Sequence, residues 1–525
     1  MTDAPSFVPF SESSLLMRVG DRIDVETTRR IAVFADSMLA RPIDGVRDFV
    51  PSYRSILFIY DLNVTSVGDL RRQATARWRD SSPQESALST PAVTIPVIYG
   101  DSFGDDLSEV AAFHGLSSDE IVERHTAGCY TVGALGFSPG FAYLLGLDPS
   151  LATPRRSRPR TRIPGGSVGI GGAQTGTYAL PSPGGWNLIG RTPMRLFDPS
   201  RENPLALSLG DEVRFQQISP KDAPPFPEYG ARTEYLAGEG QIEVLSPGLQ
   251  TTVQDLGRYG FGRMGFAPNG AADTASLVAA NRLVSNPDDA AGLEMTLSGP
   301  TIRFHRRTAI ALTGANLNAL LNGLPLLPGR PQGVMPGDEL AVRGVSGPGA
   351  RGYLAVAGGI DVPVVLGSRS TDLTAGIGGH DGRALRAGDW LPIGTMRRSN
   401  GAGPISATVV DPGVPLAVHP GPEADCFPDE AWEAFLSATF ILAADSNRMG
   451  IRLEGPLLRP AGPADIISEG LVTGSIQVTG EGQPIVMLPG HATIGGYARI
   501  ATVIDADLDR LGQLRPGDSV RFRLA

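Results

Sequence analysis

Leu207-Ser-Leu-Gly-Asp-Glu-Val-Arg-Phe215 and Leu514-Arg-Pro-Gly-Asp-Ser-Val-Arg-Phe522 are two copies of one pattern, in which a Gly-Asp turn enters an alternating strand. Each copy follows a stretch that begins Gly-Ser, at Gly166 in one half and at Gly474 in the other. The distance from that glycine to the glycine of the turn is 44 residues in the first half and 43 in the second. Gly-Asp turns are common in β-proteins. Two copies that follow similar Gly-Ser stretches at nearly the same distance nevertheless predict an internal duplication. We therefore expect two fused, strand-rich modules rather than one large domain.

The composition also indicates many strands joined by tight turns. Of the 525 residues, 66 are glycine and 44 are proline, and aromatic residues are few. Two looser copies of the turn, at Gly337-Asp338 and Gly388-Asp389, lie between the two copies quoted above. A chain of this length is expected to hold about three or four domains.

The charge pattern argues against several classes of partner. The formal net charge is −10 and no basic run occurs, so neither nucleic acid nor a membrane surface is an expected partner. No stretch approaches the roughly 20 apolar residues of a membrane span. The start of the chain lacks the basic and apolar segments of a secretory signal. We therefore expect a cytoplasmic protein in which Cys129 and Cys426 are free, buried thiols.

Lysine occurs once, as Lys221, and the other 44 basic residues are arginines. A P-loop needs a lysine after its glycines and a biotin carrier needs one for attachment, and neither setting occurs in the sequence. A pyridoxal Schiff base at Lys221 is not expected, because this lysine lies in a proline-rich linker. If ATP or carboxybiotin takes part, the ATP binds without a P-loop and the biotin is carried by another chain.

Residues 12–99 follow the order β-α-β-β-α-β, which predicts a ferredoxin-like subdomain. The predicted elements are a strand at 15–19, a helix at 25–40, two strands within 46–60, a helix at 66–79 and a strand at 92–99. The first helix places Ile31, Phe34, Met38 and Leu39 on its predicted buried face.

The rest of the chain divides into four parts. We expect a barrel at 100–218, a linker at 219–241, and a second module with subdomains at 242–395 and 409–525, separated by a break at 397–404. Helices are predicted at 105–114, 118–127, 272–284 and 429–436, and most of the remainder is expected to form strands and turns. The helix at 118–127 opens with a capping box, Ser117 to Glu120.

Several catalytic patterns in this glycine-rich chain lack the structural setting that they need. Ser138 and Ser167 each fit G-x-S-x-G, but a nucleophile elbow requires a helix directly after the serine. Ser138 precedes a proline and Ser167 enters an alternating strand. Residues 260–265 fit G-x-G-x-x-G without a buried strand before them, so a dinucleotide site is not predicted there. The histidines show no metal-ligand spacing, and no metal site is predicted.

Residues 133–199 carry more glycine and proline than strands require, which is typical of turns that let a ligand approach the backbone. Four arginines in this region could hold carboxylate or phosphate oxygens in a planar fork, namely Arg155, Arg158, Arg160 and Arg191. The alternative interpretation is a surface cluster in an arginine-rich chain, and the sequence leaves both open.

The longer motifs resemble a known family. Residues 13–215 resemble the first carboxyltransferase-type module, found in the B-type subunit of bacterial ATP-dependent 5-oxoprolinase and in the Kip sporulation kinase inhibitor. The resemblance rests on four segments, 51–55, 136–143, 161–170 and Ser182-Pro-Gly-Gly-Trp-Asn-Leu-Ile-Gly-Arg-Thr-Pro193. Residues 243–525 resemble the partner module, the C-type subunit, through 247–258, 293–300, 353–361, 366–373 and Ser446-Asn-Arg-Met-Gly450. Both modules also form the carboxyltransferase region of urea carboxylase.

The resemblance implies a strand-rich α+β fold, with an N-terminal ferredoxin-like subdomain and cyclophilin-like β-barrels in two fused modules. It implies an enzyme component, an ATP-dependent amidohydrolase that opens 5-oxoproline to L-glutamate together with a separate A-type subunit. ATP, with Mg²⁺, is the implied co-substrate, and a small amide is the substrate. No covalent biotin is expected on this chain, and homo-oligomer formation is left open.

Family site residues carried onto matching positions fall in both halves. Those given catalytic roles by the resemblance are His125, Asp255 and Glu469. Those given substrate- or nucleotide-binding roles are Arg160, Gln174, Thr175, Tyr178, Arg191, Gln254, Arg258, Asn269, Asp273, Arg369, Thr371, Asp372 and Arg448.

One loop departs from the family pattern. Where the family usually has Asp-x-Gln-Thr-Thr-Gly-Gly-Tyr, this chain has Gly490-His-Ala-Thr-Ile-Gly-Gly-Tyr497. If the loop contacts a ligand, the substrate or the activity differs from that of the family; if the loop is only structural, the change has no such consequence. Two other functions also stay open, a carboxyltransferase that acts on an amide with carboxybiotin from another protein, and a non-catalytic, Kip-like regulator of a histidine kinase.

Overall fold

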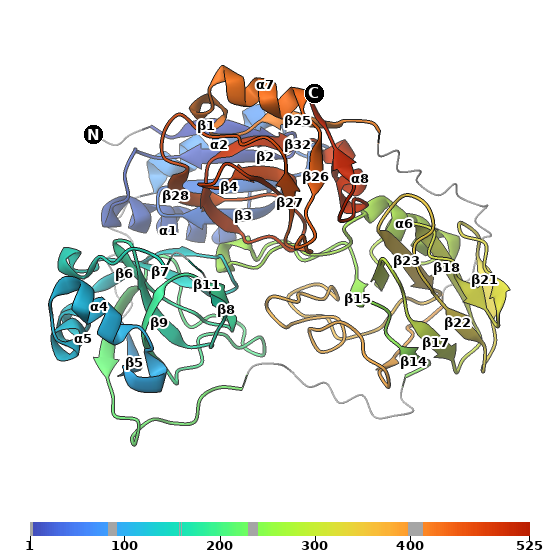
Figure 1. Ribbon diagram of the computed structural model, residues 1–525, viewed down its shortest axis with the longest axis horizontal. Helices are drawn as coiled ribbons and strands as arrows, with labels where there is room; N and C mark the ends of the chain where they lie inside the picture. Colours follow the sequence, from blue (N-terminus) through green and yellow to red (C-terminus); the bar gives the residue numbers. More distant parts are fainter. Residues whose placement is uncertain (1–3, 82–91, 157, 159, 229–239, 397–412) are drawn as a thin grey trace.

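The computed structural model describes residues 4–81, 92–156, 158, 160–228, 240–396 and 413–525. The fold is strand-rich α+β with a barrel in each module, as predicted (Figure 1). The predicted linker at 219–241 lies partly outside the described residues. The predicted break at 397–404 and the start of the last subdomain at 409 lie wholly outside them.

The N-terminal subdomain is an antiparallel sheet in the order β1-β2-β4-β3, with two helices on one face. Its elements are β1 Ser6–Ser11, β2 Ser14–Arg18, α1 Val25–Ala40, β3 Val46–Ser52, β4 Ser55–Tyr60 and α2 Val67–Asp80. Asp24 caps α1 by accepting the N–H of Thr27 at 2.8 Å. Both predicted helices are confirmed. The predicted buried face is wrong at Leu39, which is 45% exposed because it lies about 100° around the helix from buried Met38.

The strand predicted at 92–99 forms, but it does not complete this sheet. β5, Val93–Tyr99, pairs in parallel with β13, Glu212–Gln217, and antiparallel with β12, Asn187–Arg191. It therefore belongs to the first barrel, and β1, which was not predicted, takes the sheet edge beside β2. Local periodicity indicates that a strand forms, but its partner is set by contacts distant in sequence.

The first barrel has the strand order β6-β13-β5-β12-β9-β10-β7 and closes through a pairing of β6 with β7. Its other strands are β6 Tyr130–Leu135, β7 Ala142–Leu145, β9 Ser167–Gly171 and β10 Gln174–Thr177, with a separate ribbon of β8 Arg160–Ile163 and β11 Ser182–Gly184. The predicted helices α4, Leu107–His114, and α5, Ser118–Ala127, pack on it, and the capping box of α5 is confirmed.

The C-terminal barrel repeats this order. Its sheet runs β33-β26-β27-β30-β29-β32-β25-β34, and β33 and β34 are successive pieces of the last strand region. The bounds are β25 Leu416–Pro420, α7 Asp429–Ser437, β26 Phe440–Leu442, β27 Gly450–Glu454, β29 Ser475–Val478, β30 Pro484–Met487, β32 Arg499–Val503, α8 Leu508–Gly512, β33 Ser519–Val520 and β34 Phe522–Leu524. In both barrels the strand after the Gly-Asp turn pairs in parallel with the first barrel strand, β13 with β5 and β34 with β25. The predicted duplication is therefore confirmed in the topology.

Between the barrels in sequence lie two sheets packed face to face around one apolar core. One sheet holds β14 Ile242–Ser246, β17 Thr301–Phe304, β19 Leu320–Leu321, β20 Leu324–Pro325, β22 Glu339–Ala341 and β24 Trp390–Leu391. The other holds β15 Gln250–Gln254, β16 Gly292–Thr296, β18 Thr308–Gly314, β21 Gln332–Val334 and β23 Arg351–Val356, with α6, Thr274–Leu283, beside β18 and β23.

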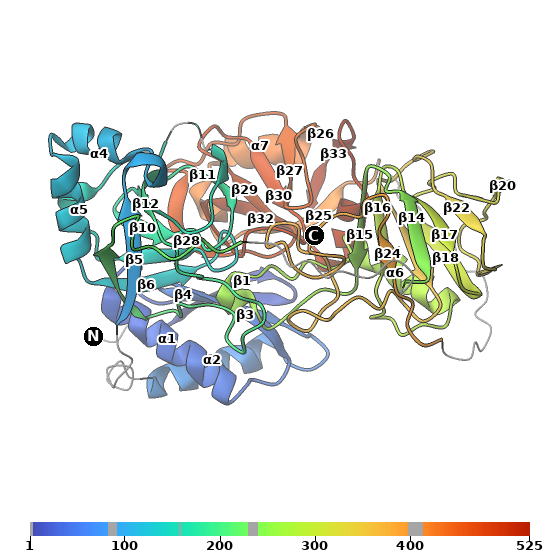
Figure 2. The same ribbon diagram turned by 90° about the horizontal axis from the view of Figure 1, so that it is seen from below.

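The C-terminal barrel lies against the N-terminal sheet, although the two are at opposite ends of the chain (Figures 1 and 2). β28, Asp465–Gly470, which pairs with β31, Ile494–Tyr497, contacts β3 and β4. The segment 255–271 of the second module makes a second contact with the N-terminal sheet, in which the N–H of Gly262 donates to Asp48 at 3.1 Å. Met264 and Phe266 of this segment enter the core of the first barrel. The G-x-G-x-x-G at 260–265 thus serves close packing, since a Cβ at Gly262 would lie 2.9 Å from Val50.

Cys129 and Cys426 are free thiols, as predicted, but the prediction that they are buried is wrong, because both are exposed. Cys129 lies in the turn just before β6, and Cys426 ends a short 3-10 helix on the surface.

All four Gly-Asp turns have the same hydrogen bonds. The aspartate carboxylate accepts the N–H of the residue three positions earlier, at 2.8 Å for Asp211, 2.7 Å for Asp338, 2.7 Å for Asp389 and 3.0 Å for Asp518. The glycine before each aspartate has φ between +84° and +93°, a region that favours glycine. The repeated sequence pattern is therefore a repeated turn geometry.

We expect Asp518→Ala to lower the free energy of unfolding by about 1–2 kcal/mol, because the Arg515 N–H loses a charged acceptor. Asp518→Asn keeps an acceptor oxygen and should lose less. Asp44→Ala, at an exposed position, serves as the control. Urea denaturation followed by circular dichroism measures the effect, and equal stability of the Asp518→Ala and Asp44→Ala variants would contradict it.

Candidate functional site

A pocket of about 310 Å³ lies where loops of the first barrel meet the C-terminal barrel. The first module contributes Phe137, Tyr143 and Arg155. The second module contributes Asn447, Met449, Gly450, Arg452, Ser468, Leu471, Gln477, Ile485, Met487, Ala492, Ile494, Gly495, Gly496 and Tyr497. Because both modules build its walls, the pocket depends on their docking.

Glycines let the walls approach each other. A Cβ at Gly136 would lie 2.7 Å from both Thr493 Oγ1 and Ile494 Cγ1, which belong to the other module. A Cβ at Gly495 would lie 2.5 Å from Gln477 Nε2. These positions require glycine for close approach, and they set the spacing between the loop that carries Phe137 and the wall opposite it.

The lining combines apolar side chains with a few polar groups. Arg155 and Arg452 are exposed cations, the second of them 3.2 Å from Asp445. Burial raises the pKa of Tyr143 to about 12, so its phenol stays neutral. Gln477 supplies an amide. Such a lining suits a small, partly apolar molecule that carries an amide and an anionic group.

The loop that departs from the family pattern forms part of this pocket. Ala492 and Ile494 line it at two of the altered positions, and Gly495 to Tyr497 follow in the same wall. The departure therefore changes the surface that a ligand in this pocket would meet. Asn447, Arg452 and Gln477 were not predicted as site residues, and the signals that could have indicated them were this loop and the Ser446-Asn-Arg-Met-Gly450 motif.

Among the described residues, none of the site residues carried over from the family lines the pocket, whereas Arg155 of the predicted arginine cluster does. His125 is buried, with Nδ1 2.8 Å from the Tyr99 hydroxyl and Nε2 2.8 Å from the Thr175 hydroxyl. Burial lowers the pKa of His125 to about 3, so the ring is neutral near pH 7. Tyr178 is 1% exposed, and its ring packs edge-on against Phe141. Here the hydrogen bonds and packing hold the barrel together.

The other predicted residues of the first half each contact a different partner. Gln174 donates to the Tyr53 hydroxyl at 3.0 Å. Arg160 forms an ion pair with Asp106 at 2.7 Å, and Arg191 donates through Nε to a backbone carbonyl at 2.9 Å. Their proposed binding roles stay predictions.

Six predicted residues of the second half come together from two segments, 254–258 and 369–372. Asp255 accepts the N–H of Arg369 at 2.6 Å, and Gln254 donates to the carbonyl of Thr371 at 3.2 Å. Arg258 is 1% exposed and donates to the carbonyl of Ser370 at 2.6 Å. Asp372 accepts the N–H groups of the next turn at 2.9 Å. These bonds shape the loop whose Ala375 and Ile377 enter the core of the first barrel.

Asn269, Asp273 and Arg448 belong to a buried network between the middle sheets and the C-terminal barrel. Arg448 donates to Glu294 at 3.1 Å, and Asp273 accepts from Gln513 at 2.6 Å. The N–H of Asn269 donates to the carbonyl of Pro489, next to the altered loop, at 3.0 Å. Arg448 also lies between two lining residues of the pocket, so this network supports the pocket wall from behind.

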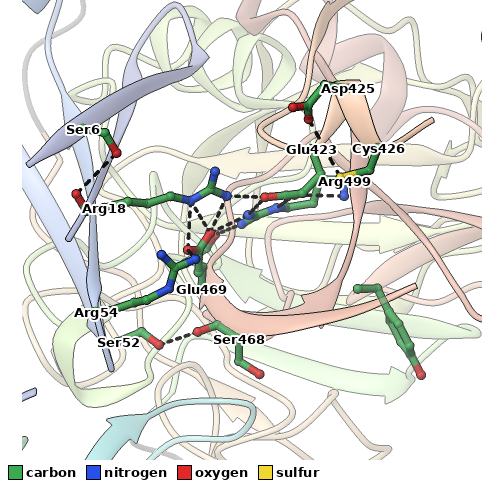
Figure 3. Close-up of polar contacts among 12 residues, drawn as sticks. Ser6, Arg18, Ser52, Arg54, Glu423, Asp425, Cys426, Ser468, Glu469 and Arg499 are labelled. Atoms are coloured by element: carbon green, nitrogen blue, oxygen red, sulfur yellow. Dashed lines mark hydrogen bonds and ion pairs between the residues drawn. The ribbon is translucent and has the colours of Figure 1, made fainter. Parts of the chain in front are cut away.

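Glu469 lies in an ionic cluster between the N-terminal sheet and the C-terminal barrel (Figure 3). It accepts from Arg18 Nη2 at 2.7 Å and from Arg499 Nη2 at 2.7 Å, and it is 1% exposed. Glu423 accepts from the same two arginines. Burial alone would raise the pKa of Glu469, but the charges of Arg499 and Arg18 hold it below its ordinary value. This geometry joins the modules, and a catalytic role for Glu469 stays a prediction.

Among the described residues, no group of three or more His, Cys, Asp or Glu side chains is placed to hold a metal ion. Within the same residues, no helix has both the length and the apolar character needed to cross a membrane.

Comparison with known proteins identifies the class. Residues 5–207 match the carboxyltransferase domain, subdomain C and D, and residues 264–524 match the carboxyltransferase domain, subdomain A and B. The chain belongs to this family and fuses the two parts in one polypeptide.

Particular relatives match each part. The chain is 41% identical to the C-type subunit of 5-oxoprolinase from Escherichia coli, over 54% of this chain and 90% of the relative. It is 38% identical to the B-type subunit of 5-oxoprolinase from Bacillus subtilis, over 40% of this chain and 92% of the relative. Urea amidolyase of Lachancea kluyveri is 37% identical over 54% of this chain, which spans 17% of that protein. The crystal structure of TTHA0988 superposes with a TM-score of 0.85 at 37% identity, over 97% of this chain and 99% of that one.

We expect Glu469→Gln to destabilise the protein by about 3–5 kcal/mol, because the fully buried Arg499 loses a counter-charge. Asp288→Asn, which breaks an exposed ion pair with Arg282, should cost less than about 1 kcal/mol. Guanidinium denaturation followed by tryptophan fluorescence measures both variants. Equal losses in the two would contradict a joining role for the buried cluster.

The same carboxylate predicts a pH dependence. Because the folded pKa of Glu469 is lowered, its contribution to stability is present above the pKa of the unfolded chain and is lost as pH falls through the lower, folded value. Melting temperatures measured from pH 7 to acid should therefore fall more steeply for the wild type than for Glu469→Gln. If melting temperature fell equally with pH in the wild type and in Glu469→Gln, Glu469 would not contribute to the pH dependence of stability.

Proposed function

We propose that this chain is the fused B-type and C-type component of an ATP-dependent 5-oxoprolinase that works with a separate A-type subunit. One observation carries the proposal: nearly full-length matches to the B-type and C-type subunits lie in order along the chain, and the two matched modules together build the pocket. The reaction converts 5-oxoproline, ATP and two water molecules to L-glutamate, ADP and phosphate.

The chemistry of the pocket supports this substrate class. A lactam resists attack by water, and phosphorylation of its oxygen supplies a better leaving group. 5-Oxoproline carries a carboxylate, an amide and a small apolar ring. Arg452 suits the carboxylate, Gln477 suits the amide, and Met487 and Ile494 suit the ring.

A carboxyltransferase is the second candidate, favoured by the similarity to part of urea amidolyase. Lys221 is the one lysine and lies in a Pro-rich segment, so biotin would come from another protein. This candidate requires a biotinylated partner, whereas the 5-oxoprolinase requires none. A pull-down with streptavidin from the source cells distinguishes the two.

Reconstitution tests the leading proposal. The purified chain, mixed with its A-type partner, ATP and 5-oxoproline, should form glutamate well above the rate of either protein alone. Glutamate at the level of the A-type partner alone would rule the proposal out.

Within that assay we expect Arg452→Ala to raise the KM for 5-oxoproline about tenfold, equivalent to about 1.4 kcal/mol, because the pocket loses a cation. Arg523→Ala, an exposed arginine on β34, is the matched control and should behave as the wild type. An unchanged KM in Arg452→Ala would place the substrate elsewhere.

A further inference from the structure

A second hollow, of about 410 Å³, lies on the first barrel and opens more widely to solvent than the pocket. One wall is α4, with Glu109 and Phe113, and the other is the segment that carries Arg155, Arg156 and Arg158. Arg155 lines both this hollow and the pocket between the modules. The two spaces therefore adjoin at one guanidinium group.

The arginine-bearing segment is held in place at two points before Arg158. The N–H of Arg156 donates to the carbonyl of Gly185 at 2.8 Å, and the Asn187 amide donates to the carbonyl of Pro154 at 2.8 Å. The Arg156 guanidinium pairs with Asp106 at 2.7 Å and with Glu109 at 3.0 Å. The backbone on either side of Arg155 is therefore fixed, so that Arg155 loses less entropy when it binds an anion.

The hollow has an excess of positive charge. Its lining holds three arginines, Arg155, Arg156 and Arg158, and one carboxylate, that of Glu109. Arg156 pairs with Glu109 and with Asp106. Arg155 and Arg158 have no carboxylate within ion-pair distance among the residues that the structure describes. In a chain of net charge −10, such a surface attracts an anion locally.

An aromatic ring lies beside these charges. Phe113 is 62% exposed at the end of α4, and its ring stands edge-on to His114, with 4.9 Å between centroids. Arg155, whose guanidinium lies 5.9 Å from the centroid of the Trp186 ring, and Arg158 have no carboxylate partner among the described residues. A phenyl ring in the same hollow as these two cations suits a ligand that has both a flat heterocycle and phosphates.

We propose that this hollow binds a nucleoside triphosphate, with its phosphates on Arg155 and Arg158 and its base against Phe113. The inference deepens the proposed function, on which it rests, by locating the ATP that the reaction needs. Because Arg155 also lines the pocket, phosphates held there lie next to the bound amide. The site needs no P-loop lysine, in keeping with a chain that has a single lysine.

Calorimetry with the full chain and ATP, without the A-type partner, tests the site. Arg158→Ala and Phe113→Ala should each weaken ATP binding at least tenfold, and Arg330→Ala, an exposed arginine of the middle sheets, should leave it unchanged. Inorganic tripolyphosphate should compete with ATP in the wild type and bind Phe113→Ala as well as it binds the wild type. Unchanged melting temperatures show that the variants are folded.

No ATP binding to the full chain, or wild-type binding by both Arg158→Ala and Phe113→Ala, would overturn the inference. So would variants that keep ATP binding but fail to bind the A-type partner, since the hollow would then be a protein docking surface. The two proposals fail separately. ATP binding without glutamate formation counts against the proposed function alone, and glutamate formation without ATP binding to this chain counts against the nucleotide site alone.

Discussion

Glu469 connects the two ends of the chain, because its carboxylate is shared by Arg18 of the N-terminal sheet and Arg499 of the C-terminal barrel. Glu423 completes the cluster, which gives each buried guanidinium a counter-charge (Figure 3). Charges buried this deeply are tolerated only with close partners, so the cluster admits few alternative arrangements of the two modules. The position of the C-terminal barrel over the N-terminal sheet, and therefore the pocket, depends on it.

Docking produces a site that neither module has alone. The pocket takes Phe137, Tyr143 and Arg155 from one barrel and most of its remaining surface from the other. The duplicated barrels have the same strand order, yet they contribute differently. The first barrel supplies aromatic and cationic groups from β7 and from its loops, and the second supplies the glycine-rich wall at 492–497. One fold thus serves two roles through its loops.

Among the residues matched to the family, Asn269 and Arg448 lie next to the wall of the pocket, and others fix a loop of the second module. Asp255 and Arg258 fix the loop at 366–372, and Arg448 with Glu294 supports the wall next to Asn447 and Met449. The hydrogen bonds of Asp255, Arg258 and Arg448 show that these residues position loops and walls. Sequence motifs of a family include residues that position a site as well as residues that bind a ligand. Both kinds are needed for the geometry of the site, so the motif alone does not distinguish them.

The sequence by itself determined the local structure. Helices such as 25–40 and 118–127 followed from periodicity and capping, and the spacing of the Gly-Asp turns indicated the duplication, because these signals lie within a few residues or repeat along the chain. Tertiary structure alone decided that β5 joins the barrel, that both cysteines are exposed, and that Arg155 meets Gln477 and Tyr497 in one pocket. Those outcomes depend on strand pairing and on contacts between segments about 300 residues apart, which local patterns do not encode.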